Sequence, residues 1–356
     1  MDYFRIRDRD SPVSPEGIIF RVYGYNHPKN ACLCDIEYAN SRIYNSKDPR
    51  APRFTKNGKT YYKFYADGGL NFIKQNYPQY LIFYPPFQNN QVGIKKNQMR
   101  ELRKPDIKLK EILSHDAPDR LIELTMHIFE LIEDHSTLNR KYFGVFGSIL
   151  HNFYHLDYSD IDLIIYGKKN LEKFKEIMSD FYLDNSFPIN NEFDGPAANI
   201  TPRHWYYKNY SVQEYLKYQR EKLIYATIKS KKMNRIVKIE FEPVKAWNEI
   251  KEKNLENIRI EKVGWIRASG RIIDGSNGFY MGGSYSIEIE KILDGPKIDG
   301  IKKIVNYLEE YRGQLGNDEK FLAEGNLEKV TTPHDEFHQI TLTYGPNYDD
   351  QVLKKL

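Results

Sequence analysis

Cysteine is almost absent from this sequence, and its scarcity argues against two classes of protein. The 356 residues include only Cys32 and Cys34. A Cys-x-Cys pair on one strand face is badly placed for a mutual disulfide and is too small a set for a zinc site. We therefore expect two buried thiols in a reducing compartment rather than a disulfide scaffold or a zinc protein.

Long apolar runs and a strong charge of either sign are also lacking. No segment approaches the ~20 apolar residues that a membrane-spanning helix needs, and the first five residues lack an apolar signal core. We therefore expect a cytoplasmic protein with no membrane partner. The formal net charge of +4 comes from 53 basic and 49 acidic residues, so charge alone favours a polyanionic partner only slightly.

The chain does contain ample material for packed cores. Hydrophobic residues make up 40% of it and aromatic residues 14%, which argues against long disorder. A chain of this length exceeds one domain of usual size. We predict an α+β protein with an amino-terminal β-rich module at 1–105, a central catalytic domain at 106–250, and a carboxy-terminal β domain at 251–356.

The amino-terminal module is predicted from short alternating apolar runs between Gly and Pro turn clusters. Its expected strands and one short helix lie at 18–23, 31–38, 59–65 and 70–76. The basic and polar residues from Lys95 to Lys104 then indicate a linker that ends at Pro105.

The other two domains are predicted from helical and strand periodicity. In the central domain we expect helices at 117–135, 171–183 and 212–229, and strands at 142–146, 160–166 and 235–244. In the last domain we expect strands at 264–273, 280–292, 321–330 and 339–344, with a short helical stretch at 301–312. That order suits a small barrel of the oligonucleotide/oligosaccharide-binding (OB) type.

Two aspartates open the apolar strand expected at 160–166. Asp160 and Asp162 are two residues apart, so both side chains project from one face while the intervening apolar residues project from the other. Carboxylate oxygens are the ligands that Mg²⁺ and Mn²⁺ prefer. Two such ions can activate a hydroxyl and hold a triphosphate, which is the chemistry of nucleotidyl transfer. Asp160 and Asp162 are therefore candidate catalytic and metal-binding residues.

A Gly-Ser turn precedes this strand. Gly147 and Ser148 follow the strand expected at 142–146 and stand at an expected helix start, where free backbone N–H groups and the helix dipole favour phosphate. Gly147 would let a phosphate approach the backbone, and Ser148 would donate from its hydroxyl. We predict both as nucleotide-binding residues.

A third carboxylate is expected on a neighbouring strand, because two aspartates leave one metal under-coordinated and the attacking hydroxyl without a base. Alternation along 235–244 places Lys238, Glu240 and Glu242 on one face. We choose Glu240 as the third catalytic and metal-binding residue, with Glu242 as its rival, and Lys238 as a nucleotide-binding residue.

Each of these features has an ordinary explanation when taken alone. Gly-Ser is commonplace, Asp-x-Asp occurs in solvated turns and in other metal sites, and glutamates on a strand face are usually just exposed. Their order along the chain, with a strand, Gly-Ser, about a dozen residues and then Asp-x-Asp opening an apolar strand, favours a nucleotidyltransferase site.

The two motifs together resemble the signature of the polymerase-β-like nucleotidyltransferase superfamily. With the segments 17–22 and His27-Pro28, the chain is also similar over most of its length to an archaeal family of predicted nucleotidyltransferases that have an amino-terminal β module and a carboxy-terminal β domain. The resemblance implies a short mixed sheet flanked by helices and a magnesium-dependent transfer from a nucleoside triphosphate such as ATP. It also implies that the Gly-Ser pair binds the triphosphate, that both aspartates bind both metal ions, and that Glu240 binds the catalytic metal with the attacking hydroxyl.

The sequence departs from the superfamily pattern in two ways. Many small members have an arginine soon after Gly-Ser, whereas this chain has the segment 149–152, Ile-Leu-His-Asn. The phosphate charge must therefore be met elsewhere. The third carboxylate is an aspartate in most members, and Glu240 adds a methylene that alters its distance to a metal.

Further basic residues are candidate contacts for a nucleic-acid backbone. Lys231, Lys232 and Arg235 surround the entry to the strand at 235–244, and Arg203 opens an aromatic run that could stack a base. The alternative interpretations are a solvated turn for the first group and packing for the aromatic run.

The leading hypothesis is an enzyme that transfers a nucleotidyl group from an NTP to a hydroxyl acceptor and releases pyrophosphate. The expected OB-type domain favours a nucleic acid such as RNA as the acceptor. One alternative is the same chemistry on a protein or a small molecule. A second is a nucleic-acid-binding protein that keeps the fold without turnover.

Overall fold

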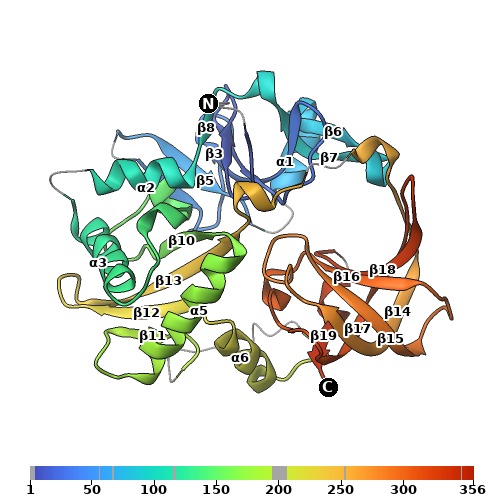
Figure 1. The fold of residues 1–356 in the computed structure, drawn as a ribbon. Helices are drawn as coiled ribbons and strands as arrows, with labels where there is room; N and C mark the ends of the chain where they lie inside the picture. The colour runs from blue at the N-terminus through green and yellow to red at the C-terminus, as the bar shows by residue number, and fades with distance from the viewer. Residues whose placement is uncertain are drawn as a thin grey trace. The chain divides into compact units, whose positions relative to one another are not determined.

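We describe the fold from a computed structural model. The structure describes residues 5–55, 57–65, 68–114, 118–194, 207–251, 254–345 and 347–356. Within these residues the protein mixes few helices with three sheets (Figure 1), which confirms the expected combination of helices and sheets. By contact density the chain forms two compact units, which comprise residues 1–84, 89–190 and 224–252, and residues 85–88, 191–223 and 253–356.

The first sheet is formed by the amino-terminal part of the first unit. Its strand order is β4-β5-β3-β2-β1-β8, and β7 joins it by pairing with β3 and with β6. The strands are β1 (Ser11–Val13), β2 (Ile18–Val22), β3 (Ala31–Asn40), β4 (Pro52–Phe54), β5 (Thr60–Lys63), β6 (Leu81–Tyr84), β7 (Asn89–Lys95) and β8 (Glu101–Arg103). Alternate residues of β2 and β3 form its core with Phe72 and Ile73 of α1 (Gly68–Asn76).

The expected linker at 95–104 is wrong. Strand β7 ends at Lys95 and pairs with β3, and β8 pairs antiparallel with β1, with Ser11 opposite Arg103. Lys and Arg are tolerated on short edge strands, because their backbone forms the ladder while their charged ends stay near water. The strand β8 is at the edge of this sheet, so the basic residue Arg103 is compatible with a strand there.

The second sheet belongs mainly to the first unit and has the order β11-β12-β13-β10-β9. Its strands are β9 (Phe143–Val145), β10 (Ile161–Tyr166), β11 (Ile189–Asn191), β12 (Tyr225–Ser230) and β13 (Arg235–Val244). Strands β10 and β13 are parallel, whereas β9 is antiparallel to β10 and β12 is antiparallel to β13. The helices in this part of the chain are α2 (Pro105–Leu113), α3 (Arg120–Asp134), α4 (Gly147–Leu150) and α5 (Lys168–Leu183).

Local sequence explains where the helix α3 begins. Asp119 is its N-cap, and the Asp119 carboxylate accepts hydrogen bonds from the backbone N–H groups of Leu121 and Ile122, both at 3.2 Å. Such a cap satisfies donors that the first helical turn leaves without partners. Ile128, Phe129 and Ile132 of the same helix are then fully buried, as the apolar spacing predicts.

The helix expected at 212–229 is wrong in its second half. Helix α6 (Val212–Glu221) ends before Leu223, whose φ is +59°, a left-handed conformation that a helix cannot continue through. Strand β12 then begins at Tyr225 and pairs with β13 along its length. The apolar residues of this stretch satisfy both a helical and a strand pattern, and the pairing with β13 decides for the strand.

The third sheet lies in the second unit. Its strands are β14 (Arg259–Asp274), β15 (Gly283–Asp294), β16 (Ile301–Asn306), β17 (Lys320–Thr331), β18 (Glu336–Leu342) and β19 (Val352–Lys355). The pairings run β14-β15-β16-β18-β17 and return to β14, with β19 added to β17. The residues 301–312, expected as helical, instead form the strand β16 and a single 3₁₀ turn at Glu309–Tyr311, so that expectation is wrong.

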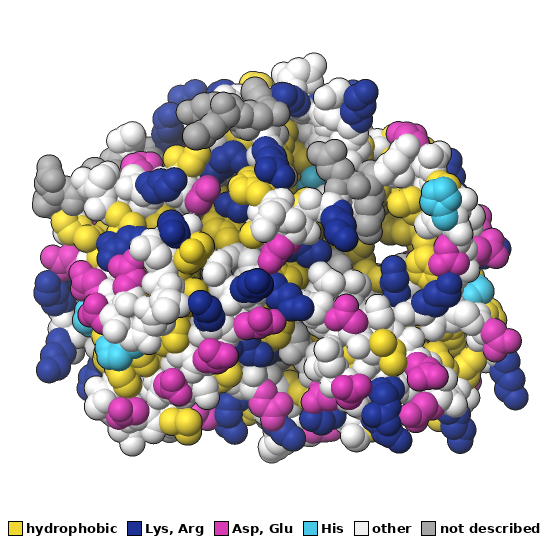
Figure 2. Space-filling model, in the orientation of Figure 1, with side chains coloured by type: hydrophobic (Ala, Val, Ile, Leu, Met, Phe, Trp, Pro, Cys, Tyr) yellow, Lys and Arg dark blue, Asp and Glu magenta, His cyan; other side chains and the backbone are white. Residues whose placement is uncertain are grey.

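The features that the sequence has little of can be followed in the structure. Cys32 and Cys34 are buried free thiols on one face of β3, with their Sγ atoms 3.5 Å apart. None of the helices among the described residues is long and apolar enough to cross a membrane. Basic and acidic side chains are interspersed on the face shown in Figure 2, in line with the small net charge.

Candidate active site

The two aspartates stand at the start of β10, the strand between β9 and β13 in the second sheet. Asp160 directly precedes the strand and is exposed, whereas Asp162 lies within it and is partly buried. Ile161 and Leu163 between and after them are fully buried. The strand therefore presents carboxylates on one face and packs its apolar residues on the other.

Gly147 lies directly against the carboxylate of Asp162. A Cβ atom built on Gly147 would stand 1.9 Å from Oδ2 of Asp162, and the residue has φ +54°. The backbone N–H of Phe146 donates to the carbonyl of Asp162 at 2.8 Å, which fixes this close approach. Only glycine fits here, because any side chain would collide with the carboxylate and would strain the backbone.

The helix after the Gly-Ser turn is a single turn, from Gly147 to Leu150. A helix dipole is a sum over aligned peptide units, so one turn contributes little of it. Phosphate binding at this turn would therefore rest on backbone N–H groups and on the hydroxyl of Ser148, which is partly buried. The contribution expected from the dipole is correspondingly smaller.

Glu240 and Glu242 lie on the same face of β13 but in different surroundings. In the parallel pairing of β10 with β13, Asp162 is opposite Glu240, whereas Glu242 is opposite Ile164. Glu240 is partly buried. Glu242 is buried, and its Oε2 accepts a hydrogen bond at 2.8 Å from Arg9, a residue with no exposed surface. Glu242 is thus held in a structural ion pair, and Glu240 is the carboxylate in register with Asp162.

The first sheet reaches the candidate site through β5. Tyr61 packs on Phe153 with ring centroids 5.0 Å apart, and the N–H of Phe153 donates to the carbonyl of Ser148 at 2.9 Å. Lys63 follows Tyr61 by two residues on the same strand, so its side chain projects from the same face. Lys63 is consequently directed toward the Gly-Ser side of the second sheet.

The electrostatics of Asp162 reflect these neighbours. The pKa of Asp162 is raised to about 6, chiefly by burial and next by the negative charge of Asp160, while the positive charge of Lys63 lowers it. Glu242 also raises this pKa, because its charge is buried and is therefore weakly screened. A site that destabilises a lone carboxylate in this way favours a bound cation.

The residues present suit a divalent cation in part. The pair Asp160 and Asp162 offers carboxylate oxygens from one strand face, and their mutual repulsion would be relieved by a cation. Among the described residues, however, no three His, Cys, Asp or Glu side chains are grouped so that they could hold a metal ion. Glu240 shares the strand register of Asp162 without completing such a group, so its role as the third ligand stays a prediction.

The other residues predicted to contact a nucleotide or a nucleic acid differ in their exposure and in their partners. Arg235 donates from its guanidinium to the carbonyls of Leu156 and Ser159, at 3.1 and 2.5 Å, and so holds the segment that leads to Asp160. Lys231 and Lys232 are exposed in the turn between β12 and β13, where Lys232 pairs with Glu123 at 2.8 Å. Lys238 is exposed on the Glu240 face of β13. Arg203 lies outside the described residues.

Two cations that act on the carboxylates, Arg9 and Lys63, were not predicted from the sequence. Arg9 belongs to a run of alternating charges at residues 7–10, a pattern that is usually solvated, yet all four residues are buried. Lys63 stands in an ordinary strand pattern. The absence of an arginine after Gly-Ser indicates that another segment supplies the cation, but it does not identify that segment.

The raised pKa of Asp162 predicts a pH effect on stability. A carboxyl whose pKa rises from 3.8 unfolded to about 6 folded stabilises the fold below pH 4, and this contribution is lost as the pH rises through 6. Without divalent metal, Asp162→Asn should therefore gain about 2 kcal/mol relative to the unchanged protein between pH 4 and pH 7, after allowance for partial solvent access. Urea unfolding in EDTA at a series of pH values measures it.

Asp157→Asn is the matched control, because the Asp157 side chain is 79% exposed in the neighbouring turn. Its unfolding free energy should follow that of the unchanged protein across the series. Addition of Mn²⁺ at pH 7 should stabilise the unchanged protein and not Asp162→Asn. A stability difference that does not vary with pH would contradict the assigned electrostatics.

Comparison with known proteins adds one relative of unknown activity. The chain is 25% identical over 329 residues to an uncharacterized protein of Methanocaldococcus jannaschii, MJ1086, and the match covers 92% of each chain. No protein-family model matches the chain. No solved structure matches it either.

Proposed function

We propose that this protein is a metal-dependent nucleotidyltransferase with its active site at the start of β10. The acceptor hydroxyl would give its proton to Glu240 as its oxygen attacks the α-phosphate of an NTP. A new P–O bond would form, and the bond to pyrophosphate would break. Asp160 and Asp162, with Glu240, would hold Mg²⁺ or Mn²⁺, and the bound ions would neutralise phosphate charge and activate the hydroxyl. The remaining residues position the triphosphate.

The contact between Gly147 and Asp162 is the observation that carries this proposal. The backbone of Gly147 lies so close to Asp162 that a Cβ atom built on it would stand 1.9 Å from Oδ2, so no side chain fits between the turn and the carboxylate. The turn, the aspartate pair and the parallel partner strand meet at that point although they come from three segments of the chain. Chance motif matches would not be expected to converge in this way.

Lys63 supports the proposal by supplying the charge that the Gly-Ser segment lacks. Many small members of the superfamily have an arginine soon after Gly-Ser, and here that segment contains Ile149 and Leu150. A lysine directed to this place from β5 would bind a triphosphate as a point charge. We assign Lys63 to the binding of the β- or γ-phosphate.

The third sheet supports a nucleic-acid acceptor. Its pairings close through β14, β15, β16, β18 and β17, and β16 is parallel to β18. We propose that this sheet is an OB-like barrel, a fold whose strand faces and loops bind oligonucleotides. RNA is accordingly the acceptor class that we favour.

The decisive experiment is transfer of label from each of four α-³²P-labelled NTPs in the presence of Mg²⁺ or Mn²⁺. Total RNA and total protein serve as separate acceptors. We expect label in RNA with the unchanged protein and background label with Asp160→Asn/Asp162→Asn, because the double variant loses both metal-binding carboxylates. Lys63→Gln should raise the KM for NTP more than it lowers kcat, since it would bind phosphate in the ground state as well.

The controls separate this proposal from its alternatives. Asp157→Asn should transfer as the unchanged protein does. If label enters protein and not RNA, the acceptor is a protein. If label transfer persists in the double variant, Asp160 and Asp162 are not the catalytic residues. Calorimetry with Mn²⁺ and NTP that shows no coupled binding would identify a protein without turnover.

A further inference from the structure

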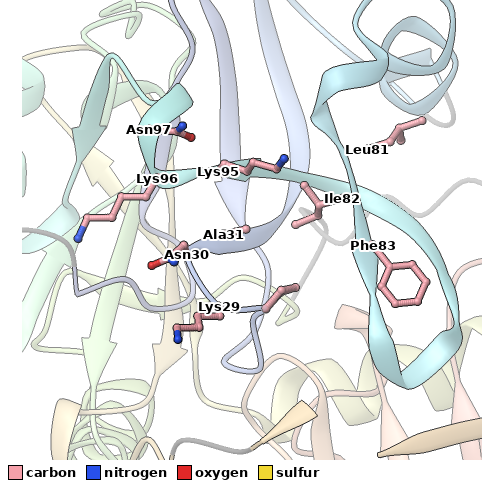
Figure 3. A pocket seen from close by; sticks show the side chains of 10 residues that line it. Lys29, Asn30, Ala31, Leu81, Ile82, Phe83, Lys95, Lys96 and Asn97 are labelled. Atoms are coloured by element: carbon pink, nitrogen blue, oxygen red, sulfur yellow. The ribbon is translucent and has the colours of Figure 1, made fainter. Parts of the chain in front are cut away.

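A pocket on the first sheet has the chemistry of a nucleic-acid site and lies apart from the candidate active site in the sequence. It has a volume of about 820 Å³ and is lined by residues of the turn before β3, of β6, and of the end of β7. Figure 3 shows Lys95 extending toward β6 and the ring of Phe83 standing on β6. Its polar side chains are Lys29, Asn30, Lys95, Lys96 and Asn97.

The pairing of β3 with β7 brings the lysines together. Ala31 is opposite Lys95 in this antiparallel pairing, and the N–H of Lys96 donates to the carbonyl of Asn30 at 2.9 Å. The backbone at Lys29 therefore lies close to that at Lys95 and Lys96, although distant segments supply them. Figure 3 shows Lys95 extending toward β6, whereas Lys29 and Lys96 extend to the other side. Asn30 has a left-handed backbone conformation, with φ +60°, and turns the chain between Lys29 and β3.

Charge and aromatic surface coincide in this pocket. Among the described residues that line it, three are lysines and none is acidic, whereas the chain as a whole is nearly balanced in charge. Phe83 is 52% exposed, so its ring is accessible to a bound base. Lysines along a groove with an exposed aromatic ring are the pattern of single-strand binding, in which phosphates meet cations and a base stacks.

We propose that this pocket binds single-stranded RNA, with its phosphates at Lys29 and Lys95 and a base on Phe83. Asn30 and Asn97 offer amide groups that can hydrogen-bond base edges or ribose hydroxyls. The inference rests on the proposed function insofar as the bound strand is the acceptor of the nucleotide. Binding itself requires neither metal nor NTP, so it can be measured separately.

Fluorescence anisotropy with a labelled oligouridylate of about 12 nucleotides, in EDTA and without NTP, tests the proposal. Lys29→Ala/Lys95→Ala should weaken binding and reduce the slope of log affinity against log salt by about 1.4, since each phosphate contact on a single strand contributes about 0.7. Phe83→Ala should weaken binding roughly 5-fold or more with an unchanged slope, because stacking releases no counterions.

Matched controls remove the same groups elsewhere in the first unit. Lys47→Ala/Lys59→Ala removes two exposed lysines, and Phe54→Ala removes an aromatic ring that is 61% exposed. Both should bind as the unchanged protein does. Equal affinities in the pocket variants and the controls would overturn the proposal. So would polyglutamate that competes as well as oligouridylate while Phe83→Ala has no effect, which would indicate an acidic protein partner.

Failure of the RNA-binding proposal can be distinguished from failure of the proposed nucleotidyl transfer. Asp160→Asn/Asp162→Asn should bind oligouridylate with unchanged affinity, because the pocket residues are intact. Loss of binding in the pocket variants, combined with no transfer by the unchanged protein, would leave an RNA site without the enzyme. If the pocket variants change neither RNA binding nor transfer to RNA, the pocket is not the RNA site, while the proposed enzyme activity stands.

Discussion

Gly147→Ala is expected to destabilise the protein by about 3 kcal/mol and to lower nucleotidyl transfer by roughly 100-fold or more. The added methyl would stand 1.9 Å from Oδ2 of Asp162, so either the turn or the carboxylate must move. Left-handed backbone adds about 1 kcal/mol of strain for any residue with a Cβ atom. Urea unfolding gives the stability, and the α-labelled NTP assay gives the rate.

Gly58→Ala separates the strain from the collision. Gly58 has φ +74°, and nothing lies within 4 Å of the position that a Cβ atom would occupy there. This variant should therefore lose only the strain of about 1 kcal/mol and keep full transfer. The difference in stability loss between Gly147→Ala and Gly58→Ala therefore measures the collision with Asp162. Equal stability losses in both would show that Gly147 is required for its backbone conformation and not for its contact with the carboxylate.

The fold was predictable where local pattern and pairing agree. The strand expected at 235–244 has those same bounds in the structure, because its alternation is long and one face is apolar from Val237 to Pro243. The helix expected at 117–135 is present as Arg120–Asp134 for the equivalent reason. The failures at 212–229 and 301–312 are apolar stretches whose neighbours in the sheet impose the strand conformation, and no pattern within the stretch contains that information.

Some residues of the candidate site could likewise be predicted from the sequence, and others could not. Asp160, Asp162 and Gly147 were identified because their spacing along one short segment corresponds to a spatial arrangement. Lys63 comes from β5 and Arg9 from the turn before β1, and they meet the carboxylates only through tertiary structure. Sequence alone also left Glu240 and Glu242 as rivals, since both lie on one face of β13. The ion pair with Arg9 is what distinguishes them.

Arg9→Met is expected to destabilise the protein by about 3–5 kcal/mol, the usual effect of breaking a buried ion pair on one side. Arg9 has no exposed surface, its Nη2 lies 2.8 Å from Oε2 of Glu242, and Asp8 stands 3.9 Å from its Nε. Removal of the guanidinium leaves a buried carboxylate without its cation. Urea unfolding at pH 7 measures the loss.

The double variant Arg9→Met/Glu242→Gln should recover much of that loss, because it removes both charges together. Arg50→Met is the matched control for an exposed pair, since Arg50 and Asp48 are 2.7 Å apart but Arg50 is 72% exposed, and its stability should stay close to that of the unchanged protein. Transfer activity then decides the role of Glu242. If Glu242 serves structure, the double variant keeps its transfer while Glu240→Gln loses it; the reverse result would make Glu242 the third metal ligand, and the pair with Arg9 would be a contact that the metal has to displace.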